Sequence, residues 1–218
     1  MVRQAFREQI RELLEELLEM GQMVADSIDS SIQALAKQDQ DLAQRVIDHD
    51  DEINALQYEI DEKCLVLIAT QQPMAGDLRT ILSVSNIAAE LERIGDYSEG
   101  IARLAIKLAG RPLLKPLIDI PRMADEGRRM LMAALEAFAR QDVESAARIG
   151  EGDDVVDALY DQVYRELLVY MMEDPRTITQ ATYLLWVAHN LERIADRTTN
   201  IAERVIFLDS GRIVDLNR

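Results

Sequence analysis

The chain has 218 residues, of which 48% are hydrophobic and 5% aromatic, and it contains only nine glycines and five prolines. Such a composition is typical of a helical protein with a packed core. The formal charge of −16 argues against binding to nucleic acid or to an anionic membrane surface, because both require a surplus of Lys and Arg.

The N-terminal stretch MVRQAFREQIRELLEELLEM is charged throughout, which is not the pattern of a signal peptide. The stretch TITQATYLLWVAHN is too short and too polar for a membrane helix, which needs roughly 18 or more apolar residues. Cys64, the single cysteine, lies in the apolar run KCLVLIA and is expected to be buried. We therefore expect a cytoplasmic protein without a membrane-inserted segment or an internal disulfide.

The prolines mark the ends of the predicted helices, because proline is tolerated in the first turn of a helix but not in its interior. They lie at Pro73, within LAGRPLLKPLIDIPR and at Pro175. Between these marks, apolar residues recur at helical spacing over stretches of about 30 residues. The pattern predicts six helices, over residues 4–36, 39–71, 74–108, 122–139, 142–172 and 176–208.

The two halves of the chain resemble each other. ELERIGDYSEGIA, from Glu90, and NLERIADRTTNIA, from Asn190, share seven of thirteen residues at an offset of 100. KQDQDLAQRVIDHDDEINAL, from Lys37, and RQDVESAARIGEGDDVVDAL, from Arg140, share eight of twenty at an offset of 103. The three-residue difference places a deletion in the intervening turn of the second half, so each half is predicted to contain three helices.

We therefore expect an all-α fold of two tandem antiparallel three-helix bundles. The first bundle is predicted to cover residues 1–110 and the second residues 122–218, with a proline-rich linker over 111–121. The alternative is a long helical hairpin that dimerises as a coiled coil.

Both copies of the repeated motif carry two carboxylates four residues apart. At about 100° per residue, Glu92 and Asp96 lie on a different stripe of the helix from its apolar residues, and Glu192, Asp196 and Asn200 lie on the same stripe in the second copy. Like charges at this spacing repel by a few tenths of a kcal/mol, so their repetition favours a ligand pair over the alternative of a solvated helix face.

A second set of oxygen atoms lies on the preceding helix of each half, where Asp50 and Asn54 correspond to Asp153 and Asp157. Adjacent antiparallel helices could present the two sets opposite each other with a cation between them. Oxygen ligands suit hard cations such as Mg²⁺, Ca²⁺, Mn²⁺ or iron. His49 and His189 lie at unrelated positions of the repeat and are not expected to be ligands. The candidate metal ligands are Asp50, Asn54, Glu92, Asp96, Asp153, Asp157, Glu192, Asp196 and Asn200.

Catalytic motifs are not found in the sequence. A di-metal oxidase of the ferritin-like type needs Glu-x-x-His on two helices, and no Glu in this chain has a His three residues later. The sequence also contains no Gly-rich phosphate loop and no Gly-x-Ser-x-Gly. We therefore expect a protein that is not an enzyme.

The motifs together resemble the PhoU family of accessory regulators of bacterial phosphate uptake. The resemblance is carried by LERIGD at 91–96, LERIAD at 191–196, the following NIAE at 200–203 and the turn QQPMAGDLRTI at 71–81, and it extends to the closing IFLDSGRIVDL. It implies that each bundle binds metal at its surface, with iron the first choice and Mg, Mn or another hard cation possible.

Carried over by position, the implied ligands are Glu92, Asp96 and Asp50 in the first repeat, and Glu192, Asp196, Asp153 and Asp157 in the second; Asn54 and Asn200 are weaker candidates. The first repeat departs from the pattern at Gly100 and Arg103, where the second has Asn200 and Glu203. The first site is therefore expected to hold fewer ions, or none.

By resemblance, the protein is a cytoplasmic homodimeric adaptor that reaches the inner membrane only through its partners. These partners are the ATPase subunit of the phosphate ABC transporter and the sensor histidine kinase of the phosphate regulon, and the outcome is negative regulation of uptake and of the regulon. The alternative is a metal-storing or metal-buffering helical bundle. Because so acidic a surface repels phosphate, we expect any phosphate contact to be bridged by bound cations.

Overall fold

The computed structural model describes residues 2–212 and 214–216. Its helices are α1 (Val2–Lys37), α2 (Gln40–Gln71), α3 (Ala75–Leu108), α4 (Asp119–Arg140), α5 (Val143–Ala147), α6 (Gly150–Glu173), the 3-10 helix η1 (Pro175–Thr177) and α7 (Ile178–Ser210). The described residues contain no β-strand, which confirms the predicted all-α class. No described helix has the length and apolar character that a membrane span requires.

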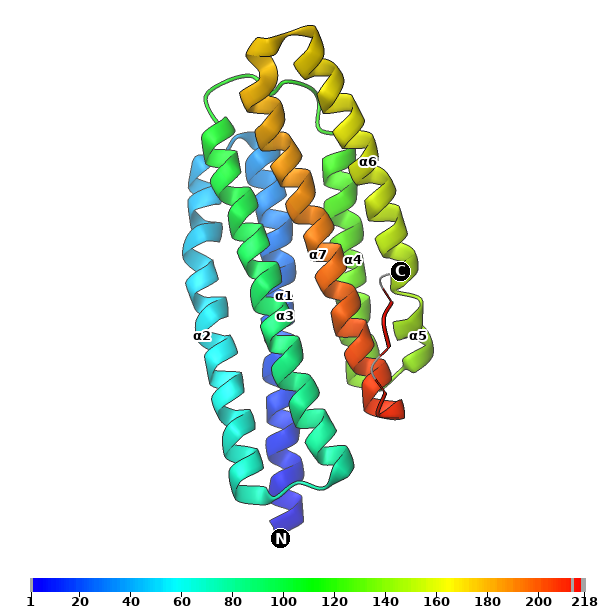
Figure 1. Cartoon of the computed structure of the whole chain (residues 1–218). Helices are drawn as coiled ribbons and strands as arrows, with labels where there is room; N and C mark the ends of the chain where they lie inside the picture. The colour runs from blue at the N-terminus through cyan, green and yellow to red at the C-terminus, as the bar shows by residue number, and fades with distance from the viewer. Residues whose placement is uncertain (1, 213, 217–218) are drawn as a thin grey trace.

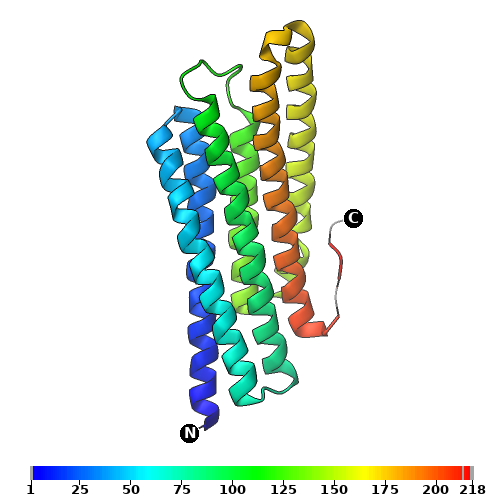
Figure 2. The ribbon, with the colours of Figure 1, turned by 60° about the vertical axis from the view of Figure 1, so that its left-hand side comes forward.

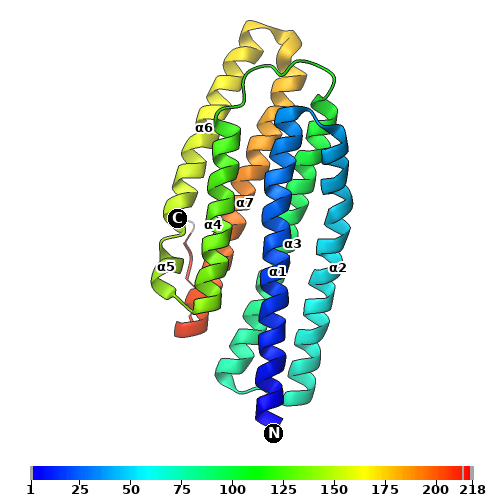
Figure 3. The same ribbon diagram turned by 180° about the vertical axis from the view of Figure 1, so that it is seen from behind.

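The helices form two antiparallel three-helix bundles that lie side by side (Figure 1). One bundle consists of α1, α2 and α3, and the other of α4, α6 and α7, with α5 beside α7. The bundles meet where α3 packs along α7 and where α1 packs along α4, and Figure 2 and Figure 3 show these two contacts from other sides. The tandem repeat of three-helix units is therefore confirmed, whereas the domain boundaries at 110 and 122 stay a prediction.

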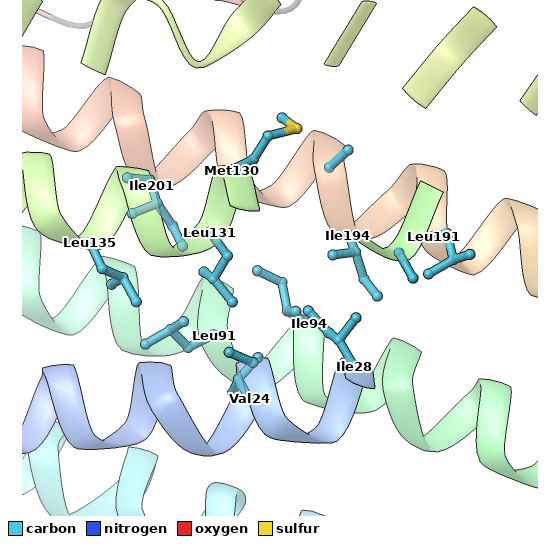
Figure 4. Packing of buried hydrophobic residues seen from close by; sticks show 14 of the residues in the cluster. Val24, Ile28, Leu91, Ile94, Met130, Leu131, Leu135, Leu191, Ile194 and Ile201 are labelled. Carbon is cyan, nitrogen blue, oxygen red and sulfur yellow. The ribbon is translucent and has the colours of Figure 1, made fainter. Parts of the chain in front are cut away.

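Buried apolar side chains from both bundles form one continuous core. Figure 4 shows its central part, where Ile28 of α1, Leu131 of α4, Ile94 of α3 and Ile194 of α7 come together. Cys64 is 3% exposed, as expected, and burial raises the pKa of its thiol to about 12. Because the core is shared, the two repeats stabilise each other.

The turn before the second helix of each repeat has the same construction. Gln38 and Gln141 adopt positive φ angles of 53° and 55°, and the Asp that follows each of them caps the next helix. Asp39 accepts a hydrogen bond from the Leu42 backbone N–H at 2.9 Å, and Asp142 accepts one from that of Ser145 at 3.1 Å. Such caps typically contribute about 1 kcal/mol each.

The fourth helix begins at Asp119 rather than at the predicted residue 122. Pro121 therefore lies inside its first turn, where a backbone N–H has no helical partner and its loss costs nothing. Buried Asp119 accepts hydrogen bonds at 3.0 Å from both Arg122 and Gln162. Buried Lys115 forms an ion pair with Glu166 of α6, so the end of the linker is held against the second bundle.

The predicted helix over 142–172 is divided into α5 and α6, with a turn at 148–149. The reason is local: the second repeat has Gly150 and Gly152 at positions where the first has Ile47 and His49, and glycine disfavours a continuous helix. A Cβ atom at Gly152 would lie only 2.7 Å from Cγ of Met130. The turn thus permits a close approach between α6 and α4.

Candidate functional site

The two copies of the repeated motif lie back to back on the seam between α3 and α7. Asn200 donates a hydrogen bond from Nδ2 to Oε2 of Glu90 at 3.2 Å. At the equivalent point of the seam, a Cβ atom at Gly100 would lie 2.9 Å from Nδ2 of Asn190. Since these positions are related by the offset of 100, the two repeats are related by an approximate twofold axis through the seam.

The first carboxylate surface, which we define as Asp50, Asn54, Glu92 and Asp96, lies between α2 and α3. Asp50 is 7% exposed, and its Oδ2 accepts a hydrogen bond from Nδ2 of Asn54 at 3.0 Å. Its Oδ1 lies 3.1 Å from the position that a Cβ on Gly95 would occupy, and this buried oxygen has no hydrogen-bond partner among the described residues. An unsatisfied buried oxygen of this kind is a suitable ligand for a cation.

The electrostatics of the first surface are unfavourable without a cation. Burial, followed by the charges of Asp96 and Glu99, raises the pKa of Asp50 to about 6. Burial and the charge of Asp96 also raise the pKa of Glu92. Arg103 forms an ion pair with Glu99 and so partly neutralises the negative charge of the first surface. The second repeat has Glu203 at the equivalent position, which adds a carboxylate instead.

The second carboxylate surface, defined as Asp153, Asp157, Glu192 and Asp196, lines a groove of about 460 Å³ between α6 and α7. Burial raises the pKa of Asp153 to about 6, with further contributions from the charges of Asp157 and Asp196. Burial also raises the pKa of Glu192, whose buried Oε2 has no hydrogen-bond partner in the described part of the chain. Negative charge is therefore concentrated here as well.

Basic groups and the chain end border the second surface. Nη1 of Arg193 lies 2.6 Å from Oδ2 of Asp196, and Nδ1 of His189 lies 3.5 Å from Oε2 of Glu192. Leu216 lines the same groove, and its backbone N–H donates a hydrogen bond to Oε1 of Glu203 at 2.9 Å. The segment after α7 thus returns to the edge of this surface.

The structure brings eight of the nine candidate ligands into the two surfaces. Each surface lies between the second and third long helices of its repeat, as expected. The exception among the nine candidates is Asn200, whose amide nitrogen is bonded to Glu90 on the seam. Further acidic residues border the surfaces and were not among the candidates, including Glu99 at the first surface and Glu151 and Asp154 at the second. The signal for Glu99 is its position three residues after Asp96, which places it on the same side of the helix.

The donor atoms of these surfaces suit a hard cation, but their side chains are not arranged as a metal site in this structure. The donors are carboxylate and amide oxygens, which such ions prefer. Within the described ranges, however, no three His, Cys, Asp or Glu side chains are arranged so that they could hold a metal ion. Side chains would have to rotate to enclose a cation, and the ligand assignment stays a prediction.

These features define a class of proteins with two tandem helical repeats and a carboxylate motif in each repeat. The family model described as "PhoU domain" matches residues 17–105 and 120–205, once in each repeat. The chain belongs to the PhoU family. This confirms the resemblance based on the motifs, and it covers both halves of the molecule.

Relatives with curated names are similar along nearly the whole chain. The phosphate-specific transport system accessory protein PhoU homolog of Aquifex aeolicus is 42% identical, over 94% of this chain and 93% of its own length. The phosphate-specific transport system accessory protein PhoU of Escherichia coli is 38% identical, over 95% of this chain and 86% of its own length.

Solved structures show the same architecture. The crystal structure of PhoU from Pseudomonas aeruginosa matches with a TM-score of 0.91 at 38% identity, covering 95% of this chain and all of that chain. The phosphate transport system regulatory protein PhoU from Streptococcus pneumoniae matches with a TM-score of 0.89 at 31% identity, covering 96% of this chain and 99% of the other. The fold is therefore that of the family.

Proposed function

We propose that this protein is a regulatory accessory protein of phosphate transport. In the cytoplasm, as a homodimer and without catalytic activity, it links the ATPase subunit of the phosphate ABC transporter to the sensor histidine kinase of the phosphate regulon. It thereby restrains phosphate uptake and represses the regulon when phosphate is plentiful. The observation that carries this proposal is the family match in both repeats, together with relatives that are named as accessory proteins of phosphate transport.

A binding measurement tests the adaptor role. We expect the full-length protein at micromolar concentration to bind the purified ATPase subunit and the cytoplasmic part of the kinase in biolayer interferometry, because long exposed helices offer extended docking faces. The ATPase subunit of an unrelated ABC transporter serves as the control and should not bind. If the protein took up metal but bound neither partner, the adaptor role would be refuted in favour of metal storage or buffering.

We further propose that the two carboxylate surfaces bind hard cations, with iron the first choice and Mg or Mn the alternatives. The support lies in the oxygen donors that each pair of facing helices brings together, including the buried Oδ1 of Asp50, which has no hydrogen-bond partner among the described residues. The raised pKa values of Asp50 and Asp153 agree with it, because a nearby cation would stabilise their charged forms. Arg103, which is paired with Glu99, supports weaker loading of the first surface than of the second.

A quadruple variant tests this metal site. We expect elemental analysis to find metal in the purified parent and almost none in a folded protein that carries Glu92→Ala, Asp96→Ala, Glu192→Ala and Asp196→Ala. The reason is that these changes remove two carboxylates from each surface. Circular dichroism verifies that the variant retains its helices.

The matched control removes four exposed carboxylates from other faces of the molecule, with Glu19→Ala, Glu59→Ala, Glu136→Ala and Glu144→Ala. It changes the net charge equally and should retain the metal. Equal metal content in both variants would show that the ions are bound elsewhere or only by the overall negative charge.

A further inference from the structure

A basic pocket lies at the end of the molecule where the linker leaves α3. Lys107 of α3, Arg111 of the linker and Arg176 of η1 line it, together with Thr179 and Tyr183 of α7, and no carboxylate is among its lining residues. The end of α3, the linker and the start of α7 are seen together at the top of Figure 1. In a chain with a net charge of −16, such a convergence of cations from three elements is unexpected.

Two of the three cations are not neutralised. No ion pair is found for Lys107 or Arg111 among the residues described, and Nζ of Lys107 lies 5.6 Å from the centre of the Tyr183 ring. Arg176 is held by Asp174, with Nη2 2.9 Å from Oδ2. The pocket therefore keeps a surplus of positive charge even when Asp174 is included.

A second pocket illustrates the difference. It is lined by Arg129 and Arg148 without a carboxylate in its wall. Both of these arginines are, however, already paired, Arg129 with Glu126 and Arg148 with Glu144 at 2.8 Å. Only uncommitted cations offer their full charge to a ligand, so the pocket at Lys107 and Arg111 is the stronger candidate.

The backbone around Arg111 is held in place before any ligand binds. Gly110 adopts a φ of +79°, which lets the chain turn sharply after α3. The side-chain amide of Gln38 donates hydrogen bonds to the carbonyl oxygens of Leu108 and Arg111. The amide of Gln180 donates one to the carbonyl oxygen of Pro112 at 2.8 Å. A fixed backbone lowers the entropy cost of binding.

The donors of this pocket suit a small oxyanion. The pocket combines an ammonium group, guanidinium groups and the hydroxyl groups of Thr179 and Tyr183, all of which donate to anionic oxygens. The start of α7 adds no free backbone donor, because η1 leads directly into it and Asp174 caps η1 by accepting a hydrogen bond from the Arg176 backbone N–H at 3.0 Å, so the side chains carry the binding. The volume of about 150 Å³ corresponds to a few water molecules of about 30 Å³ each, which is enough room for a small oxyanion.

The net charge of the protein does not prevent anion binding at this place. At physiological ionic strength, charges separated by more than about 8 Å are largely screened in solvent. A small anion in the pocket therefore interacts mainly with Lys107, Arg111 and Arg176 and only weakly with the carboxylate surfaces. The expectation that phosphate must be bridged by cations rests on the net charge and does not apply to this pocket.

We propose that this pocket binds inorganic phosphate directly, without a bridging metal ion. The site is inferred from its charge and geometry, while the choice of phosphate among small oxyanions rests on the proposed function in phosphate transport. Lys107 and Arg111 supply the principal charge-assisted contacts, and Arg176 and the two hydroxyl groups complete the set of donors. The protein would thus carry its own phosphate-responsive site, apart from the carboxylate surfaces.

Isothermal titration calorimetry with inorganic phosphate, in EDTA and at constant ionic strength, tests the site. We expect the full-length protein to bind phosphate, and the double variant Lys107→Ala/Arg111→Ala to bind at least about tenfold more weakly, because each lost contact to an exposed charged group should weaken binding by roughly a factor of three or more. The matched control, Arg7→Ala/Arg45→Ala, removes two exposed cations elsewhere and should bind like the parent.

In the titration, three outcomes would overturn the proposal: no binding at millimolar phosphate, equal weakening in both double variants, or binding only when a divalent cation is added. Cosedimentation with phosphatidylglycerol vesicles identifies a lipid source. If only vesicle binding depended on Lys107 and Arg111, the ligand would be a lipid headgroup and free phosphate would be refuted. This titration contains no protein partner, so a negative result would not bear on the adaptor role. Conversely, a failure to bind the partner proteins would not change what the titration shows about phosphate.

Discussion

Replacement of Ile194 by Ala is expected to lower the free energy of unfolding by about 3 kcal/mol, within the roughly 2–5 kcal/mol typical of such changes in a packed core. Ile194 is 0% exposed and lies where the two bundles meet (Figure 4). Its Cγ2 atom lies 3.4 Å from the position that a Cβ on Gly127 would occupy. Because Ile194 packs among other fully buried side chains of the core, the surroundings could fill the cavity only partly.

The measurement is urea unfolding followed by circular dichroism, with Ile178→Ala as the control on the same helix. Ile178 is 47% exposed, so its replacement should change the stability by about 0.5 kcal/mol or less. Both proteins should unfold in a single transition, since the bundles share one core. A similar loss in both variants, or separate transitions for the two halves, would contradict the shared core.

Replacement of Asp50 by Asn is expected to stabilise the metal-free protein at neutral and alkaline pH. The pKa of Asp50 is raised from 3.8 to about 6, so the folded protein binds this proton more tightly than the unfolded chain does. Stability therefore falls as the pH rises from about 4 to 6, and the whole penalty is present above pH 6. A difference of about two pKa units corresponds to at most about 3 kcal/mol, and we expect a gain of about 1–3 kcal/mol.

Thermal and urea unfolding in EDTA at pH 8 and at pH 4 measure this effect. The gain should be present at pH 8 and small at pH 4, where Asp50 is protonated in the folded protein and only partly ionised in the unfolded chain, whose carboxyl keeps a pKa of 3.8. The control is Asp51→Asn, which removes the same charge from an exposed neighbour and should change the stability little at either pH. An Asp50→Asn variant that is less stable than the parent at pH 8 in EDTA would show that the ionised carboxylate is not destabilising.

Helical periodicity and the internal repeat predicted the all-α architecture, the long helices and their grouping in threes. The first three helices end within a few residues of the predicted bounds, because apolar spacing and proline positions both mark them. The turn at 148–149 was missed although Gly150 and Gly152 mark it in the sequence, because the apolar residues continue in register across it and the close approach of Met130 to Gly152 is visible only in the fold. Apolar periodicity shows which face of a helix is buried, but it does not show which other helix packs against that face.

The same limit applies to the candidate site. A spacing of four placed Glu92 and Asp96 on one stripe, and the repeat identified Asp50 and Asp153 on the facing helices. The sequence pattern could not reveal that Asn200 donates a hydrogen bond to Glu90 across the seam, because this contact depends on how the two bundles pack. The basic pocket was also missed, since Lys107 and Arg176 lie far apart in the sequence and the net charge conceals their proximity.

The seam between α3 and α7 has the geometry of a contact in a symmetric dimer, in which every contact between two residues occurs a second time with their roles exchanged. Two separate copies of a single repeat could form the same contact, but every mutation would then change both sides at once. Joining the repeats in one chain removes this constraint. Arg197 lies 3.5 Å from Glu90 on one side, whereas the equivalent positions on the other side are Tyr97 and Asn190. Within one chain the two halves can differ at such positions, so that one carboxylate surface can change without the same change in the other.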